Sequence, residues 1–243
     1  EQAERGGLNP KMFNSFLDGS KPSIESTAVS NATGLGVPSN GLLYPPASVE
    51  DIPYVTRPIS EGGVLERKGM VEVISSLETD GRKIPYDIRM GVWVTVEAET
   101  DYIKNCFEEY NAHTDPSGRY FTLYKRWHLI GLEVGVSVAS VALRNEPTGV
   151  AIGWNADVVA TAKRDLKPGD MLDGEGGYTV WGKLLPAATS KRMGGVPLGL
   201  AHGVKVIRPV TKGQSLTWDD VAMDTSTHAY KIRREMEATS VLG

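Results

Sequence analysis

Asn14-Ser-Phe-Leu-Asp-Gly-Ser-Lys-Pro-Ser-Ile-Glu25 is the segment around which the rest of this chain is arranged. Its pattern predicts a strand over 12–17 that breaks at Asp18-Gly19. A helix is then expected behind Ser20, because serine is a favourable N-cap, and it should end where Gly34 supplies the left-handed stop. The segment is therefore predicted to be a strand-to-helix corner.

This corner carries three charged side chains. Lys21 and Glu25 are four residues apart, so they share one face of the predicted helix, and Asp18 comes just before it. If the corner faces a cleft, the three groups form an acid/base cluster, and Asp18 and Glu25 could bind a hard cation such as Mg²⁺ or Mn²⁺. The alternative, which spacing alone favours, is a capped helix with an ordinary surface ion pair.

The composition is that of a globular protein and excludes several classes of function. Of the 243 residues, 40% are hydrophobic and 23% are charged, which allows a sizeable core. The net charge of −4 gives no electrostatic footprint for nucleic acid. No apolar run reaches membrane-spanning length, and the N-terminus lacks a signal-peptide layout. Cys106 is the single cysteine, so we expect a reducing, cytoplasmic location, and its place on an apolar helical stripe predicts a buried structural thiol.

The pattern up to about residue 155 predicts an α+β domain. Period-two alternation over 69–99 predicts a β-meander, and residues 119–124 predict a further strand. Apolar stripes over 100–110 and 132–143 predict helices. We therefore expect an open mixed or antiparallel sheet with helices on one face.

The sequence beyond 155 changes to short strands broken by glycine and contains an internal repeat. Arg164-Asp-Leu-Lys-Pro-Gly-Asp-Met-Leu172 aligns with Arg208-Pro-Val-Thr-Lys-Gly-Gln-Ser-Leu216, and an apolar strand precedes each copy. Matching strand–turn units predict a small all-β module with pseudo-symmetric halves. The glycine-rich run 174–178 has no helix to supply amide donors, so we interpret it as a tight backbone passage and not as a phosphate cradle. The predicted domains are 1–155, the β module 156–224 and a helical tail 225–243.

A second group of polar residues lies at a predicted strand-to-helix passage. Lys125, Arg126 and His128 form a cationic segment, and Glu133 follows the histidine. Such a segment suits a phosphate or carboxylate of a small substrate. The competing interpretation is a structural histidine that donates to a buried backbone carbonyl. No two histidines have the spacing of zinc ligands.

Three segments of the chain match the pattern of one family. They are Asp18-Gly-Ser-Lys21 with Glu25 and Asn31-Ala-Thr-Gly34, then Lys125-Arg-Trp-His-Leu-Ile-Gly-Leu-Glu133, and finally residues 158–221. Together they resemble the homoserine-dehydrogenase-like oxidoreductases that carry a C-terminal SAF (β-clip) module. The second segment is similar to their P-Y-H-L-x-G-x-E signature but departs from it at Arg126 and Trp127.

The resemblance implies an NADPH-dependent oxidoreductase and assigns roles to these residues. Lys21 would be the proton-transfer or oxyanion-stabilising group, and Asp18 and Glu25 would tune its pKa or hold a divalent metal. A Rossmann domain that binds NADPH is expected upstream of this chain, and a homodimer is expected. The substrate-binding residues would be Ser20, Asn31, Arg126, His128 and Glu133.

The substrate is a carbonyl compound in each enzymatic interpretation. The resemblance to reductoisomerase-like members implies conversion of 1-deoxyxylulose 5-phosphate to 2-C-methylerythritol 4-phosphate, a step of isoprenoid precursor synthesis. One alternative is a homoserine-dehydrogenase-type reduction of an amino-acid-derived aldehyde such as aspartate semialdehyde. Another is a non-catalytic sugar-binding protein that acts through the SAF-like module, and a third makes that module a dimerisation element.

Overall fold

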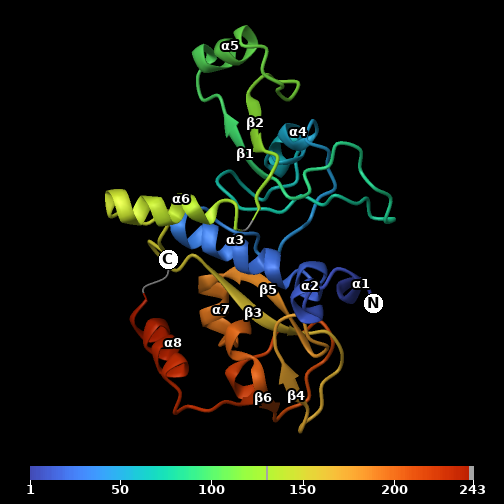
Figure 1. Ribbon diagram of the computed structural model, residues 1–243, viewed down its shortest axis with the longest axis vertical. Coiled ribbons are helices and arrows are strands. Elements are labelled where there is room, and N and C mark those ends of the chain that lie inside the picture. The colour runs from blue at the N-terminus through green and yellow to red at the C-terminus, as the bar shows by residue number, and fades with distance from the viewer. Residues whose placement is uncertain (130, 241–243) are drawn as a thin grey trace. The chain divides into compact units, whose positions relative to one another are not determined.

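The computed structural model describes residues 1–129 and 131–240, which form two compact units (Figure 1). The first unit combines Glu1–Leu42 with Ala151–Gly243, and the second unit is Leu43–Val150. Helices and small antiparallel sheets make up both, so the predicted α+β class is confirmed. The division into functional domains with boundaries at 155 and 224 stays a prediction. Within the described residues, no helix is both long and apolar enough to span a bilayer.

The first unit begins with two short helices, α1 (Gln2–Arg5) and α2 (Pro10–Leu17). The predicted strand over 12–17 is therefore wrong. The side chain of Asn9 accepts hydrogen bonds from two amides of the first turn of α2, at 2.9 Å and 3.2 Å, and Pro10 occupies the first helical position. Both features favour a helix start, and they outweigh the short apolar run that follows.

Helix α3 (Ser20–Thr33) follows directly and is longer than its neighbours. Its N-cap is Gly19, at a φ of 86°, and not the predicted Ser20, which is the first residue of the helix. Gly34, at a φ of 79°, ends the helix as predicted. The buried residues of α3 are all serines: Ser20, Ser23, Ser26 and Ser30.

A β-rich module completes the first unit. Strand β3 (Ala156–Ala162) pairs with β5 (Val180–Pro186), and α3 packs on both (Figure 1). Every residue of β3 is buried, and the main hydrophobic core gathers around it. The remaining elements are β4 (Met171–Asp173), α7 (Ala187–Met193), η3 (Leu198–Leu200), β6 (His202–Val206), η4 (Trp218–Asp220) and β7 (Val221–Ala222), of which β4, β6 and β7 form a second sheet.

The two copies of the internal repeat pair with each other. Leu166 and Val210 occupy equivalent positions and exchange two backbone hydrogen bonds, at 2.8 Å and 3.1 Å. Gly169 and Gly213 are also equivalent, and both have the positive φ that favours glycine. The Gly169 amide donates to the carbonyl of Val206, the last residue of β6, at 2.9 Å. The Gly213 amide donates to the carbonyl of Ala162, the last residue of β3, at 2.8 Å. The predicted pseudo-symmetric halves are confirmed.

The predicted helical tail is α8 (His228–Thr239), and it docks on the first unit. The guanidinium of Arg233 donates to both carboxylate oxygens of Asp157, at 3.1 Å and 2.5 Å, and to Glu237 at 2.7 Å. It also lies 4.7 Å from the ring centroid of Trp154. The tail is therefore held by a largely buried ionic network.

The second unit contains a two-stranded ribbon. Strands β1 (Val92–Glu97) and β2 (Tyr120–Lys125) pair antiparallel, and α5 (Asp101–Glu109) lies between them in the chain. The predicted β-meander is correct for β1 but wrong for 69–91, where the described chain forms only isolated bridges. There the carboxylate of Glu72 accepts hydrogen bonds from three backbone amides, at 2.8–3.4 Å, in place of a strand ladder.

The rest of the second unit has a small core and much exposed apolar surface. Helix α6 (Val134–Ala139) continues into a π-helical turn, η2 (Ser140–Arg144), so a helix is confirmed within the predicted range 132–143. Its apolar side chains are not buried in this unit. Cys106 on α5 is a free thiol and only half-buried, which corrects the prediction of a buried one. The other elements are α4 (Ile52–Val55) and η1 (Ile59–Glu61), and the core residues are Ala47, Ile52, Ile74 and Ile88.

Candidate functional site

Asp18 and Lys163 form an ion pair at the corner between α2 and α3. Asp18 Oδ2 lies 2.6 Å from Lys163 Nζ, and the side chains are only 11% and 20% exposed. Asp18 Oδ1 accepts a hydrogen bond from the Ser20 amide at 2.8 Å, so both carboxylate oxygens are engaged. Lys163 also donates to the Gly177 carbonyl at 2.5 Å. Asp18 therefore links the start of α3 to the β-rich module.

Lys21 pairs with Glu25 and not with Asp18. Lys21 Nζ lies 3.7 Å from Glu25 Oε1, and the two side chains are 24% and 50% exposed. The predicted pair across one helical turn is confirmed, but a contact between Asp18 and Lys21 is not among the described interactions. An ion pair this exposed contributes little to stability. A catalytic role for Lys21 stays a prediction.

The glycine-rich run 174–178 packs against α2. Asn14 Nδ2 donates to the Gly176 carbonyl at 2.9 Å, and Lys11 Nζ donates to the Asp173 carbonyl at 3.0 Å. A Cβ on Gly176 would collide with the Lys11 carbonyl oxygen, and the φ of Gly176 is +69°. Only glycine fits such an approach. The interpretation of this run as a tight backbone passage is confirmed.

Asp173 fixes the shape of this loop from within. Its carboxylate accepts hydrogen bonds from the amides of Tyr178 and Thr179, at 2.6 Å and 3.0 Å, and from the Thr179 hydroxyl. Burial raises the pKa of Asp173, but these hydrogen bonds outweigh burial and hold the pKa below its usual value. In the same loop, Oε1 of Glu175 is buried and has no hydrogen-bond partner in the described part of the chain.

Ser20 and Asn31, the two predicted substrate contacts on α3, both bind backbone. Ser20 is fully buried, and its Oγ accepts a hydrogen bond of 2.9 Å from the Gly182 amide. Asn31 Oδ1 accepts from the amides of Asn155 and Ala156, at 2.8 Å and 3.0 Å. Each therefore holds α3 to the sheet, and a role in substrate binding stays a prediction.

Arg126, His128 and Glu133 lie in the second unit, whereas the Asp18 corner belongs to the first. His128 Nδ1 is 2.7 Å from Glu133 Oε2, and Glu133 also pairs with Lys125. The guanidinium of Arg126 lies 5.1 Å from the ring centroid of Trp127. The histidine is thus held by a carboxylate and not by a buried carbonyl. A phosphate role for this segment stays a prediction.

The carboxylates predicted to bind a metal do not fit one in this arrangement. The part of the chain that the structure describes contains no group of three or more His, Cys, Asp or Glu side chains that could hold a metal ion. Both oxygens of Asp18 are engaged by Lys163 and the Ser20 amide, and Glu25 lies beside Lys21. Hard cations need several free oxygen ligands. Asp18 and Glu25 therefore do not form a complete metal site by themselves, and a metal role for them stays a prediction.

The described residues also do not form a dinucleotide site. Such a site needs a strand that leads through a glycine-rich loop into a helix N-terminus within a parallel sheet. All ladders between the labelled strands are antiparallel, and the run 174–178 leads into β5 and not into a helix. The described part of the chain thus contains no cradle of this kind for a dinucleotide.

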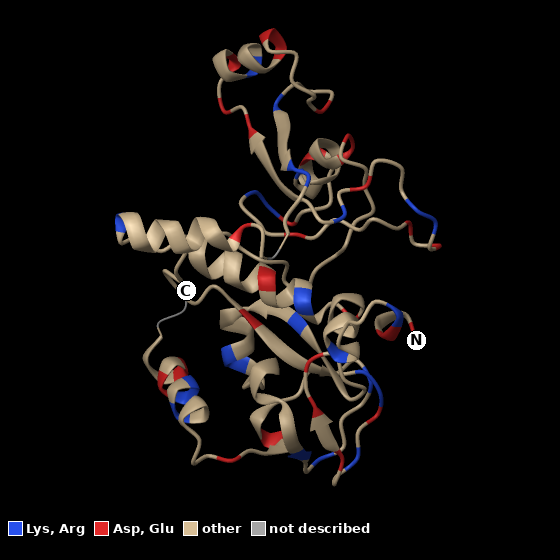
Figure 2. Ribbon diagram, viewed as in Figure 1, with Lys and Arg blue, Asp and Glu red and all other residues tan. Residues whose placement is uncertain are grey.

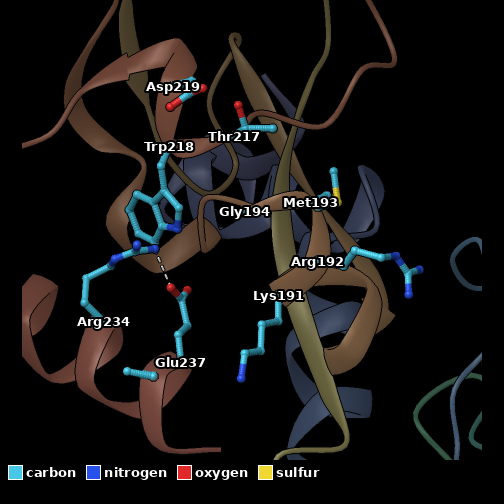
Figure 3. A pocket seen from close by; sticks show the side chains of 10 residues that line it. Lys191, Arg192, Met193, Gly194, Thr217, Trp218, Asp219, Arg234 and Glu237 are labelled. Atoms are coloured by element: carbon cyan, nitrogen blue, oxygen red, sulfur yellow. Dashed lines mark hydrogen bonds and ion pairs between the residues drawn. The ribbon is translucent and has the colours of Figure 1, made fainter. Parts of the chain in front are cut away.

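A pocket of about 480 Å³ lies elsewhere in the first unit, between α7, η4 and α8 (Figure 3). Trp218 projects into it, and its indole nitrogen has no hydrogen-bond partner among the described residues. Arg234 lies over the Trp218 ring at 5.3 Å and pairs with Glu237. None of the predicted site residues lines this pocket.

Sequence reasoning missed Lys163, which is the ion-pair partner of Asp18. The sequence did contain a signal for it. Lys163 is a charged residue that directly follows five uncharged strand residues, Val158 to Ala162. Its partner lies 145 residues earlier in the chain, so no local spacing could join them. Basic and acidic residues are otherwise interspersed in both units (Figure 2).

Comparison with protein families gives a match over the first part of the chain. The family described as "Oxidoreductase DRL, catalytic domain" matches residues 1–134, which is more than half of the chain. The matched range contains all the predicted site residues, from Asp18 to Glu133, and ends before the β-rich module that contains Lys163. A comparison with curated proteins gives no match.

Proposed function

The chain belongs to the family of oxidoreductase DRL catalytic domains, and from this premise we propose that it forms the substrate side of an NADPH-dependent reductase acting on a phosphorylated carbonyl compound. In its most specific form, the proposal is that the enzyme is a reductoisomerase that converts 1-deoxyxylulose 5-phosphate to 2-C-methylerythritol 4-phosphate. NADPH would supply the hydride and would bind to a domain separate from the two units of this chain.

The observation that carries the proposal is the position of Lys21. It lies inside the range matched by an oxidoreductase catalytic domain, on the first turn of α3, and directly follows a residue fixed by Asp18 and Gly182. Reduction of a carbonyl generates negative charge on oxygen, which a positioned ammonium can stabilise and protonate. We assign this role to Lys21, with Glu25 as its neighbour in the resting protein.

Arg126 and His128 are the residues that would bind the phosphate of such a substrate. Both side chains are cationic or can become so, and Arg126 has no carboxylate partner among the described interactions. Guanidinium groups bind phosphate with two parallel hydrogen bonds. A homoserine-dehydrogenase-type reaction on aspartate semialdehyde would instead require sites for an ammonium and a carboxylate.

Exposed apolar side chains of the second unit support the further proposal of a homodimer. Leu132, Val136 and Leu143 are 78%, 66% and 83% exposed, and Val94 and Leu123 of the β1–β2 ribbon are more than half exposed. Large exposed apolar side chains mark interaction sites where they gather into a patch. Light scattering at several concentrations would test this, and a monomer throughout would contradict it. The cytoplasmic location expected from the single cysteine stays a proposal.

The test of the proposed function measures NADPH oxidation by the full-length protein with each of two candidate substrates. We expect oxidation of NADPH with 1-deoxyxylulose 5-phosphate and none with aspartate semialdehyde. Oxidation with aspartate semialdehyde alone would favour the dehydrogenase. Oxidation with neither, together with calorimetric binding of an unmodified sugar to the same protein, would favour the sugar-binding alternative.

A further inference from the structure

We propose that Lys163 is a positioning residue of the candidate site, which fixes Asp18 and through it the first turn of α3 that carries Lys21. The inference rests on the proposed function of Lys21 and assigns part of the site to the β-rich module, outside the matched range 1–134.

The position of Lys163 is itself well defined. It directly follows β3, whose residues are all buried, and its amide donates to the Thr179 carbonyl at 2.9 Å. Its Nζ therefore projects from a rigid part of the module. There it meets two acceptors, Asp18 Oδ2 at 2.6 Å and the Gly177 carbonyl at 2.5 Å.

Asp18 connects Lys163 to the first turn of α3. Its second carboxylate oxygen holds the amide of Ser20, the first residue of the helix, at 2.8 Å. Gly19 between them has a φ of 86°, which favours glycine, and it contributes no side chain to the turn. Lys21 is the next residue along the helix. A shift of Asp18 would therefore change the direction in which the first turn presents the Lys21 ammonium.

Removal of the Lys163 ammonium takes the donor from two acceptors, Asp18 Oδ2 and the Gly177 carbonyl. Asp18 is only 11% exposed, and a carboxylate at such a site without a counter-charge is unfavourable. The Gly177 carbonyl would also lose its donor. We expect Asp18 to turn towards water, which breaks its hydrogen bond to the Ser20 amide.

The test compares Lys163→Met with Lys183→Met, both in the full-length protein. Lys183 is a matched control because it lies on the neighbouring strand β5 and donates to a neutral acceptor, Asn40, at 2.6 Å. The first readout is hydrogen exchange of the amides of residues 18–24. The second readout is kcat and KM for NADPH oxidation with 1-deoxyxylulose 5-phosphate. A third variant, Lys163→Arg, tests whether a positive charge at this position restores both readouts.

We expect Lys163→Met to speed exchange over 18–24 and to lower kcat about 10- to 100-fold with a smaller change in KM, because small misplacements of a reacting group are costly. Lys163→Arg should recover most of this loss, and Lys183→Met should change neither readout. Unchanged exchange with Lys163→Met, or an unchanged kcat, would overturn the inference.

The Lys21→Ala variant distinguishes failure of the proposed function from failure of this inference. If Lys21→Ala abolishes turnover while Lys163→Met does not, the proposed function stands and this inference fails. If Lys163→Met lowers kcat while Lys21→Ala does not, the role of Lys21 fails, and the inference that Lys163 acts through Lys21 fails with it.

Discussion

Ser20 Oγ accepts a hydrogen bond of 2.9 Å from the backbone amide of Gly182, 162 residues later in the chain. A Cβ on Gly182 would lie 2.5 Å from Val158 Cγ1 and 2.6 Å from Leu198 Cδ2, so the close packing of β5 against these two side chains favours glycine at this position. The first residue of the helix that carries Lys21 is thus held by the β-rich module as well as by Asp18.

Ser20→Ala should lower the free energy of unfolding by about 1–3 kcal/mol, because it leaves the buried Gly182 amide without an acceptor. Urea denaturation measures the change. Thr27→Val is a matched control on the same helix, since the Thr27 hydroxyl is buried and has no hydrogen-bond partner among the described residues. Equal destabilisation by the two changes would contradict the role given to Ser20.

Gly176→Ala should destabilise the protein by about 2–3 kcal/mol, because its Cβ would collide with the Lys11 carbonyl. Gly203→Ala is the control, because Gly203 has nearly the same φ, +68°, but open space around it. That variant should lose only about 1 kcal/mol from backbone strain. If thermal unfolding shows the same loss for both, the loop does not pack on α2 as described.

Arg233→Met should destabilise the first unit by about 3–5 kcal/mol, because Asp157 would remain buried without its counter-charge. The matched change Arg208→Met removes an exposed pair with Asp219, at 3.3 Å, and should lose no more than about 1 kcal/mol. Guanidinium denaturation distinguishes the two. A small effect of Arg233→Met would show that α8 does not depend on this network.

Asp115 should make the second unit sensitive to acid. Burial raises the pKa of Asp115, but hydrogen bonds from Tyr120, Ser117 and Arg119 outweigh burial and hold the pKa below its unfolded value of 3.8. Its stabilisation is therefore complete above that value and is lost as the pH falls through the lower folded-state pKa.

The Asp115→Asn variant should then lose less stability than the wild-type protein as the pH falls below about 4. Urea denaturation over this pH range measures the slope. Glu109→Gln, at an exposed position of α5, should leave the slope unchanged. Parallel slopes for Asp115→Asn and the wild-type protein would refute the assignment.

Local patterns in the sequence predicted those parts of the fold that neighbouring residues determine. The internal repeat was visible, and Leu166 and Val210 pair as symmetric halves should. The end of α3 at Gly34, the strand β1 and the helical tail also follow from local signals. The strand predicted over 12–17 was wrong because Asn9 caps this segment as a helix, and a good cap outweighs a short apolar run.

The candidate site was only partly predictable, because its contacts join distant residues. The pair of Lys21 and Glu25 follows from helical spacing and is present. Asp18 pairs with Lys163 and not with Lys21, and no local pattern could reveal that partner. The buried positions of Ser20 and Asn31 likewise depend on strands more than 100 residues away.

The most direct measurement of the central claim is kcat/KM for NADPH oxidation by Lys21→Ala, with Lys205→Ala at an exposed position of β6 as the control. If the Lys21 ammonium stabilises the substrate oxygen, Lys21→Ala should lower kcat/KM by about 100-fold or more while Lys205→Ala leaves it unchanged. A value for Lys21→Ala within a few-fold of wild type would contradict the catalytic role of Lys21.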